Sequence, residues 1–145
     1  MNPPDLIRPE TLHLIQTRIK TLYAVYVFGS RASERTTTDS DLDLAILGKP
    51  ALSLHERIDL SDEIAIIEQC EVDIIDVFQA STVMQHEIIK MGKRVYVDGT
   101  FADEYEIFIS RNYEDLQLDR RAILEDIIRR RSVYGRRDAE QESEN

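Results

Sequence analysis

The sequence is poor in cysteine, in basic residues and in long apolar runs, and each shortage excludes a class of protein. Its single cysteine, Cys70, cannot form an internal disulfide or build a cysteine-rich zinc site. Only 18 Lys and Arg stand against 28 Asp and Glu, which gives a net charge of −10. This balance argues against a protein that holds nucleic acid by neutralising phosphates, and it fits metal-ion chemistry or a basic partner better.

Signals for export or membrane insertion are also missing. Residues 1–20 contain charged side chains throughout and lack the apolar stretch of a signal peptide. No segment approaches the roughly 18 apolar residues that a membrane span needs. The 145 residues suit one globular domain, which would bury roughly 70% of the surface that its unfolded chain exposes. We therefore expect a cytoplasmic enzyme or regulatory domain.

Hydrophobic spacing predicts an alternation of helices and strands. Helices are expected where apolar residues recur every three or four positions, and strands where β-branched and aromatic residues run together. The predicted helices cover residues 10–20, 53–69, 81–91 and 102–131, the last as one helix or two, with a short helix over 30–35. The predicted strands cover residues 22–28, 41–47, 71–78 and 94–97. This order predicts an α/β (α+β) fold, in which a mixed sheet of about four strands is flanked by helices.

The character of the chain changes after the last predicted strand. We expect a domain over residues 1–98, a helical C-terminal extension of the same domain over 99–135, and a polar, disordered tail over 136–145. In the extension, Leu116 and the isoleucines at 123 and 127 form an apolar stripe. We expect the stripe to pack on the domain's own sheet, and a surface for docking a partner is the alternative.

Gly29 and Ser30 directly follow the first predicted strand. Glycine permits a positive φ and lets the backbone approach a ligand closely. Ser30 would offer a hydroxyl and free backbone N–H groups where a helix begins, an arrangement that favours phosphate. The same two residues could instead form a simple turn that caps a helix.

Asp41 and Asp43 are two positions apart on the second predicted strand. Side chains alternate along a strand, so both carboxylates should project from one face while Leu42 and Leu44 enter the core. Paired carboxylates repel each other unless a cation lies between them, and Mg²⁺ commonly takes one or two carboxylates together with substrate phosphates. The alternative is a solvated acidic strand end. The Gly-Ser pair and the Asp-x-Asp pair together arise by chance in well under about 1% of chains of this length.

A third carboxylate is expected from the predicted strand over residues 71–78. Asp73 and Asp76 have opposite parity, so only one of them can face the Asp41–Asp43 side. Asp73 shares its face with Glu71, and this polar pairing favours Asp73. Asp76 is then expected to pair with a nearby Arg or Lys.

The stretch GSRASERTTTDSDLDL, residues 29–44, resembles the signature of the DNA polymerase β-type nucleotidyltransferase superfamily. The run EVDIIDVF and the later EIIKMGKRVYVD are similar to its minimal members, the MNT-domain antitoxins. The resemblance covers residues 10–98 well and residues 101–131 less specifically. It implies a nucleotidyltransferase fold and transfer of AMP from ATP, with release of pyrophosphate. It also implies a partner, a HEPN-domain RNase toxin that is switched off when AMP is placed on a tyrosine.

The resemblance also implies roles for individual residues. Gly29 and Ser30 would hold the β- and γ-phosphates of ATP. Asp41, Asp43 and Asp73 would bind Mg²⁺, two ions in all, and Asp73 would help to deprotonate the attacking hydroxyl.

Part of the motif departs from the family pattern. Where members often read GSRARG, this chain reads GSRASE, so Ser33 replaces a basic residue and Glu34 a glycine. Arg31 and Arg35 both remain candidates for contact with the triphosphate. The departure keeps open a weakly catalytic module that neutralises a toxin by covering it. A separate alternative is nucleotidyl transfer to a small molecule or an RNA end, but the lack of a basic surface and of length for a second substrate-binding domain weigh against it.

Overall fold

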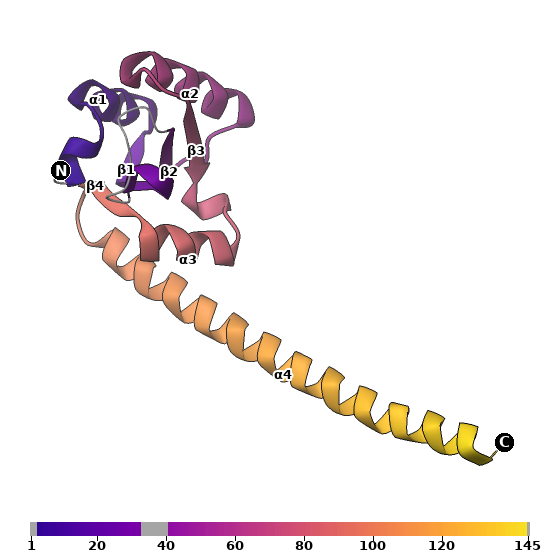
Figure 1. The fold of residues 1–145 in the computed structure, drawn as a ribbon. Coiled ribbons are helices and arrows are strands. Elements are labelled where there is room, and N and C mark those ends of the chain that lie inside the picture. The colour runs from indigo at the N-terminus through magenta and orange to yellow at the C-terminus, as the bar shows by residue number, and fades with distance from the viewer. Residues whose placement is uncertain (1–2, 33–40, 145) are drawn as a thin grey trace. The chain divides into compact units, whose positions relative to one another are not determined.

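The computed structural model describes the backbone of residues 3–32 and 41–144, and the side chains of residues 5–32 and 41–130. The chain divides into two compact units, Met1–Ile109 and Ser110–Asn145, and one long helix continues from the first into the second. The strands are β1 (Thr21–Phe28), β2 (Leu42–Lys49), β3 (Val72–Asp76) and β4 (Lys93–Val97) (Figure 1). The helices are α1 (Pro9–Arg18), α2 (Leu54–Glu68), α3 (Thr82–Met91) and α4 (Phe101–Glu144).

The first unit is built on a four-stranded mixed sheet in the order β3-β2-β1-β4. β1 is antiparallel to β2 and to β4, whereas β2 and β3 are parallel and joined through α2. The end of β1 and the beginnings of β2 and β3 therefore meet at one edge of the sheet. This arrangement confirms the predicted fold class.

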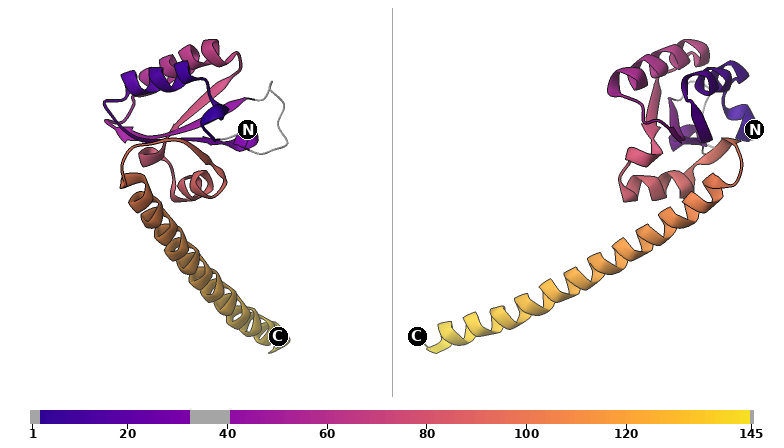
Figure 2. Two further views of the ribbon diagram at one scale, coloured as in Figure 1. Left: turned by 90° about the vertical axis from the view of Figure 1, so that its left-hand side faces the viewer. Right: turned by 180° about the vertical axis from the view of Figure 1, so that it is seen from behind.

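Alternation along the strands creates a core on each face of the sheet. Val25 and Val27 of β1 and Leu44 of β2 pack in the core that includes residues of α1 and α2. Their sequence neighbours Tyr26 and Ala45 belong to the opposite core, with residues of α3 and the first turns of α4. Figure 2 shows α1 and α2 over one face of the sheet and α3 over the other.

Short-range capping sets the starts of α2 and α3. Ser53 accepts a hydrogen bond from the Glu56 backbone N–H at 3.1 Å, and the Glu56 side chain accepts one from the Ser53 N–H at 3.3 Å, which completes a capping box. Ser81 caps α3 by accepting from the Met84 N–H at 3.1 Å. Both helices begin within one residue of the predicted position.

Two strand boundaries differ from the prediction. β3 ends at Asp76 rather than Phe78, because the Asp76 carboxylate accepts a hydrogen bond from the Phe78 N–H at 3.1 Å and starts the 3₁₀ helix η3 (Val77–Gln79). β2 begins at Leu42, so Asp41 precedes the strand instead of opening it.

The C-terminal helix also differs from the prediction. Its backbone is helical to Glu144, beyond the predicted end near Arg131, as the strong helix formers Ala, Glu, Gln and Arg of this segment favour. In the second unit, Ile123 and Ile127 of the apolar stripe are 61% and 44% exposed. The packing expected for the stripe stays a prediction.

No helix in the described part of the chain is long and apolar enough to span a membrane.

Candidate active site

The turn after β1 is shaped by Gly29. This residue has φ +71, and it opens the 3₁₀ helix η2 (Gly29–Ala32), the described portion of the short helix predicted from Ser30. A Cβ atom at Gly29 would collide with Oδ2 of Asp43. Glycine is therefore required at position 29 for two reasons: the backbone is left-handed there, and a carboxylate approaches closely.

The sheet brings the predicted carboxylates to this turn. Asp43 is paired with Phe28, the last residue of β1, and with Asp73 on the parallel strand β3. Paired residues on neighbouring strands point to the same face, so Asp43 and Asp73 project together beside Gly29. Asp41 is exposed and lies immediately before β2.

The electrostatics of Asp43 reflect this crowding. Partial burial raises the pKa of its carboxyl above the ordinary 3.8, and the negative charges of Asp73 and then Asp41 raise it further. Like charges held this close favour binding of a cation, which would relieve their repulsion.

The donor chemistry suits Mg²⁺, which takes carboxylate oxygens together with phosphates. Among the side chains that the structure describes, in residues 5–32 and 41–130, no group of three or more His, Cys, Asp or Glu residues is arranged so that it could hold a metal ion. A cation would therefore have to draw the oxygens of Asp41, Asp43 and Asp73 closer together.

Asp76 has a separate, local role. Its side chain is buried, 6% exposed, and its carboxylate caps η3 through the Phe78 N–H. The strand register places Asp73 beside Asp43, and its role as the third acid stays a prediction. The Arg or Lys partner expected for Asp76 is replaced by this backbone N–H as the hydrogen-bond donor.

Arg31 is held by the end of α2. Its Nη1 lies 3.3 Å from Oε1 of Glu68, and its Nη2 lies 3.3 Å from Sγ of Cys70. Sequence reasoning missed both partners, since hydrophobic spacing carries no information about which distant residue meets a polar side chain. The other candidate for the triphosphate, Arg35, lies outside the described residues, as do Ser33 and Glu34 of the divergent motif.

Three basic residues, Lys90, Lys93 and Arg94, lie around Gly92, and Arg94 is paired with acidic residues of α4. Arg94 forms ion pairs with Asp103 at 2.7 Å and Glu106 at 2.6 Å. Glu106 also accepts a hydrogen bond from the Tyr26 hydroxyl at 2.9 Å. Arg94 therefore joins the sheet to the first turns of α4.

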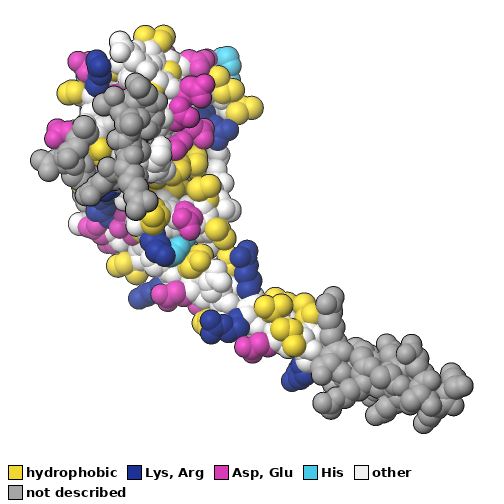
Figure 3. Space-filling view, viewed as in Figure 1, with side chains coloured by type: hydrophobic (Ala, Val, Ile, Leu, Met, Phe, Trp, Pro, Cys, Tyr) yellow, Lys and Arg dark blue, Asp and Glu magenta, His cyan; other side chains and the backbone are white. Residues whose placement is uncertain are grey.

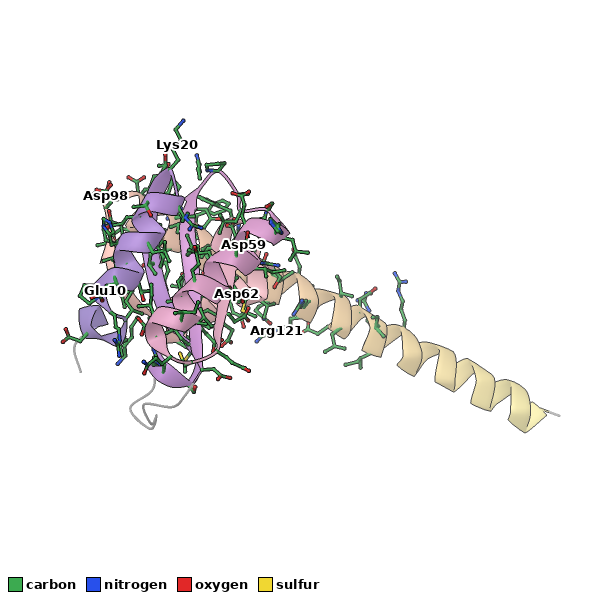
Figure 4. The ribbon with its side chains drawn as sticks, turned by 90° about the horizontal axis from the view of Figure 1, so that it is seen from above. Glu10, Lys20, Asp59, Asp62, Asp98 and Arg121 are labelled. Atoms are coloured by element: carbon green, nitrogen blue, oxygen red, sulfur yellow. The ribbon has the colours of Figure 1, made fainter. Side chains whose placement is uncertain are left out.

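The outer surface of α2 is acidic. Figure 3 shows Asp and Glu side chains gathered over this helix, and Figure 4 labels Asp59 and Asp62 on it and Glu10 on α1. All three are exposed. Substitutions at these exposed acidic residues can therefore serve as controls for substitutions at Asp41 and Asp43.

The glycine-serine turn thus packs against Asp43 on a mixed sheet, next to its strand neighbour Asp73. The family described as "Polymerase beta, Nucleotidyltransferase" matches residues 10–100. The chain belongs to this nucleotidyltransferase family.

Within the family, the chain is similar to "Protein adenylyltransferase MntA" of Shewanella oneidensis. The two are 31% identical over 120 residues, which cover 81% of this chain and 84% of that protein. Among solved structures, the chain resembles a toxin–antitoxin crystal structure with AMP-PNP, with TM-score 0.72, 27% identity, and coverage of 81% of this chain and 94% of that one. It also resembles a chain in the complex of tri-AMPylated Shewanella oneidensis HEPN toxin with MNT antitoxin, with TM-score 0.68, 26% identity, and coverage of 82% and 93%.

Proposed function

We propose that this chain is an ATP- and Mg²⁺-dependent protein adenylyltransferase that serves as an antitoxin in the cytoplasm. It transfers AMP to a tyrosine of a HEPN-domain RNase toxin and thereby neutralises the toxin. The proposal rests on one observation above all, that the Gly29 turn packs directly against Asp43, whose strand neighbour is Asp73. The likeness to an adenylyltransferase over most of its length supports the same activity.

In this proposal, Gly29 and Ser30 bind the β- and γ-phosphates of ATP. A glycine with positive φ brings backbone N–H groups close to a ligand, and the serine hydroxyl adds a donor. Asp41, Asp43 and Asp73 hold the metal ions. Two Mg²⁺ ions, when bound, stabilise the charge on the attacking and leaving oxygens.

The transfer itself is an in-line displacement at the α-phosphorus. The tyrosine oxygen forms a bond to this phosphorus, the bond to the oxygen bridging to the β-phosphate breaks, and pyrophosphate leaves with the electron pair. Asp73 accepts the proton of the attacking hydroxyl. Most of the rate then comes from positioning and from stabilisation of charge.

The experiment that tests this function follows AMP directly. Purified protein is incubated with Mg²⁺, α-labelled ATP and the candidate HEPN protein, and label on the HEPN protein is measured. We expect the unmodified chain to label its partner and the double variant Asp41→Asn/Asp43→Asn to lose the label.

The matched control is Asp59→Asn/Asp62→Asn, which removes the same two charges from exposed positions on α2. This control should label the partner at the rate of the unmodified chain. A stable complex without label would overturn the enzymatic proposal for that partner and indicate neutralisation by binding. Label on an RNA end or small molecule instead of the protein would reassign the acceptor.

A further inference from the structure

Glu68, the last residue of α2, is the meeting point of three polar contacts. Its Oε2 accepts hydrogen bonds from the Arg8 backbone N–H at 2.8 Å and from the Thr11 hydroxyl at 2.5 Å. Its Oε1 lies 3.3 Å from Nη1 of Arg31. The Glu68 side chain is only 5% exposed, and that of Arg31 is 14% exposed.

A carboxylate this deeply buried must be paired and hydrogen-bonded to remain charged. The backbone N–H of Arg8, the N-cap of α1, and the hydroxyl of Thr11 in its first turn satisfy one oxygen. The guanidinium of Arg31 supplies the opposite charge at the other. Arg31 is further tied by its Nη2 to the sulfur of Cys70, two residues beyond Glu68. Its planar head is thus engaged at two points by the segment that ends α2.

The same segment is also joined to the carboxylate side of the site. The Leu42 N–H donates to the Glu71 carbonyl at 2.9 Å, and one residue later Asp43 is in register with Asp73. Arg31 itself lies two residues after Gly29, in the turn that contacts Asp43. The end of α2 therefore connects both halves of the site, the glycine-serine turn and the paired aspartates.

We infer that Glu68 is a positioning residue for nucleotide binding, and that Arg31 acts through Glu68 to hold the Gly29–Ser30 turn in place against Asp43. The inference rests on the proposed function for its assignment of the turn to the phosphates of ATP. It makes Arg31 a part of the scaffold of the turn. The sequence-based alternative is that Arg31 touches the triphosphate itself.

The two roles are separated by a double-mutant cycle on the pair. Arg31→Gln, Glu68→Gln and the double variant are compared with the unmodified chain for binding of Mg·ATP by titration calorimetry, and for kcat and KM of AMP transfer. Glutamine at 68 keeps an oxygen that can accept from Arg8 and Thr11. We expect each single variant to weaken ATP binding about tenfold, because small displacements of a binding turn are costly.

The double variant should be no weaker than the poorer single variant, since neither partner is then left as a buried, unpaired charge. If Arg31 instead contacts the triphosphate, Glu68→Gln will bind ATP normally and the double variant will match Arg31→Gln. Strictly additive losses would also overturn the inference, because they would mean that the two residues act independently.

The matched control is Glu63→Gln. Glu63 is paired with Arg18 at 2.6 Å and likewise joins α2 to α1, but both side chains are 44% exposed. This variant should bind ATP normally. Should Glu68→Gln fail to fold in thermal unfolding, Glu68→Asp decides the question, because the shorter side chain keeps the charge but draws it away from Arg31. ATP binding should weaken in this variant if Arg31 acts through Glu68, and it should stay normal if Arg31 contacts the triphosphate.

ATP binding is measured without the toxin, so the inference and the proposed function can fail separately. Weakened ATP binding in the single variants of a protein that labels no partner would support the inference and overturn the function. Normal ATP binding in both single variants of an active enzyme would overturn the inference and leave the proposed function standing.

Discussion

At the scale of single residues, the site depends on two features that carry a conformational or electrostatic cost. Gly29 adopts φ +71, where any other L-residue is disfavoured, and it leaves no room for a side chain beside Asp43. Asp43 is a partly buried carboxylate with two like charges nearby, which raise its pKa. Such costs are typical of residues retained for binding or catalysis.

Gly29→Ala should impair ATP binding and AMP transfer by at least about tenfold, because it strains the turn and displaces Asp43. Gly99 offers a matched control, since it has φ +70 but nothing within 4 Å of the position its Cβ would occupy. Gly99→Ala should lose only about 1 kcal/mol of stability and keep its activity. Equal loss of transfer in both variants, measured with labelled ATP, would contradict a special role for the contact at Gly29.

Asp43→Asn should abolish AMP transfer yet leave the metal-free protein at least as heat-stable as the unmodified chain. The raised pKa means that the folded state disfavours the ionised carboxylate, so its contribution to stability falls as the pH rises above about 3.8 towards neutrality. Asparagine removes that penalty.

Thermal unfolding at pH 7 with and without Mg²⁺ checks this prediction. Mg²⁺ should raise the unfolding temperature of the unmodified chain and have a much smaller effect on Asp43→Asn. A metal-free variant that unfolds several degrees earlier would show that Asp43 is needed for the fold itself.

At the scale of secondary-structure elements, partly buried polar contacts attach the first turns of α4 to the sheet. Glu106 on α4 accepts from Tyr26 on β1 and is paired with Arg94 on β4, which also contacts Asp103. Tyr26 is only 2% exposed. Burial, followed by the neighbouring Glu106 charge, raises the pKa of the Tyr26 hydroxyl well above its ordinary value of 10.0.

This predicts a loss of stability in alkaline solution that depends on Tyr26. Below pH 10 the tyrosine is protonated in both the folded and the unfolded chain, so it adds no pH dependence. As the pH rises past 10, the unfolded chain ionises while the folded chain cannot, which costs about 0.8 kcal/mol at pH 10.5.

Urea unfolding of the unmodified chain and Tyr26→Phe at pH 8 and pH 10.5 measures this difference. The phenylalanine variant should lose less stability between the two pH values, although it starts lower by about 1 kcal/mol for the missing hydrogen bond. An identical pH dependence of the two proteins would contradict the assignment.

At the scale of the whole molecule, the two units differ in how they bury apolar surface. Met1–Ile109 contains the sheet and both core clusters. In the described part of Ser110–Asn145, Leu116 is half-buried. The exposed large apolar side chains on this helix, part of the yellow surface in Figure 3, are Leu118, Ile123, Leu124, Ile127 and Ile128. A helix without a buried face gains little stability from packing.

Residues 1–109 alone should therefore fold in one cooperative transition, with a midpoint within a few degrees of the full chain. Thermal unfolding followed by circular dichroism tests this expectation, with Mg·ATP binding as a check that the site is intact. A fragment that unfolds without a cooperative transition would mean that the second unit stabilises the first.

The sequence by itself determined the features that short-range chemistry specifies. The glycine-serine turn after a buried strand, the Asp-x-Asp spacing, the alternation of helices and strands and the capping box at Ser53 all follow from neighbours a few residues apart. From these patterns came the fold class and the expected site residues. Their catalytic and binding roles remain predictions for the labelling experiment.

Only the tertiary structure decided which distant residues meet. The register of β2 against β3 put Asp73 beside Asp43, and a capping contact ended β3 at Asp76. Arg31 forms an ion pair with Glu68, which is 37 residues away in the sequence. No local pattern encodes this pairing. Such outcomes depend on competition among long-range contacts for the same buried surface, and that competition is settled only when the whole chain packs.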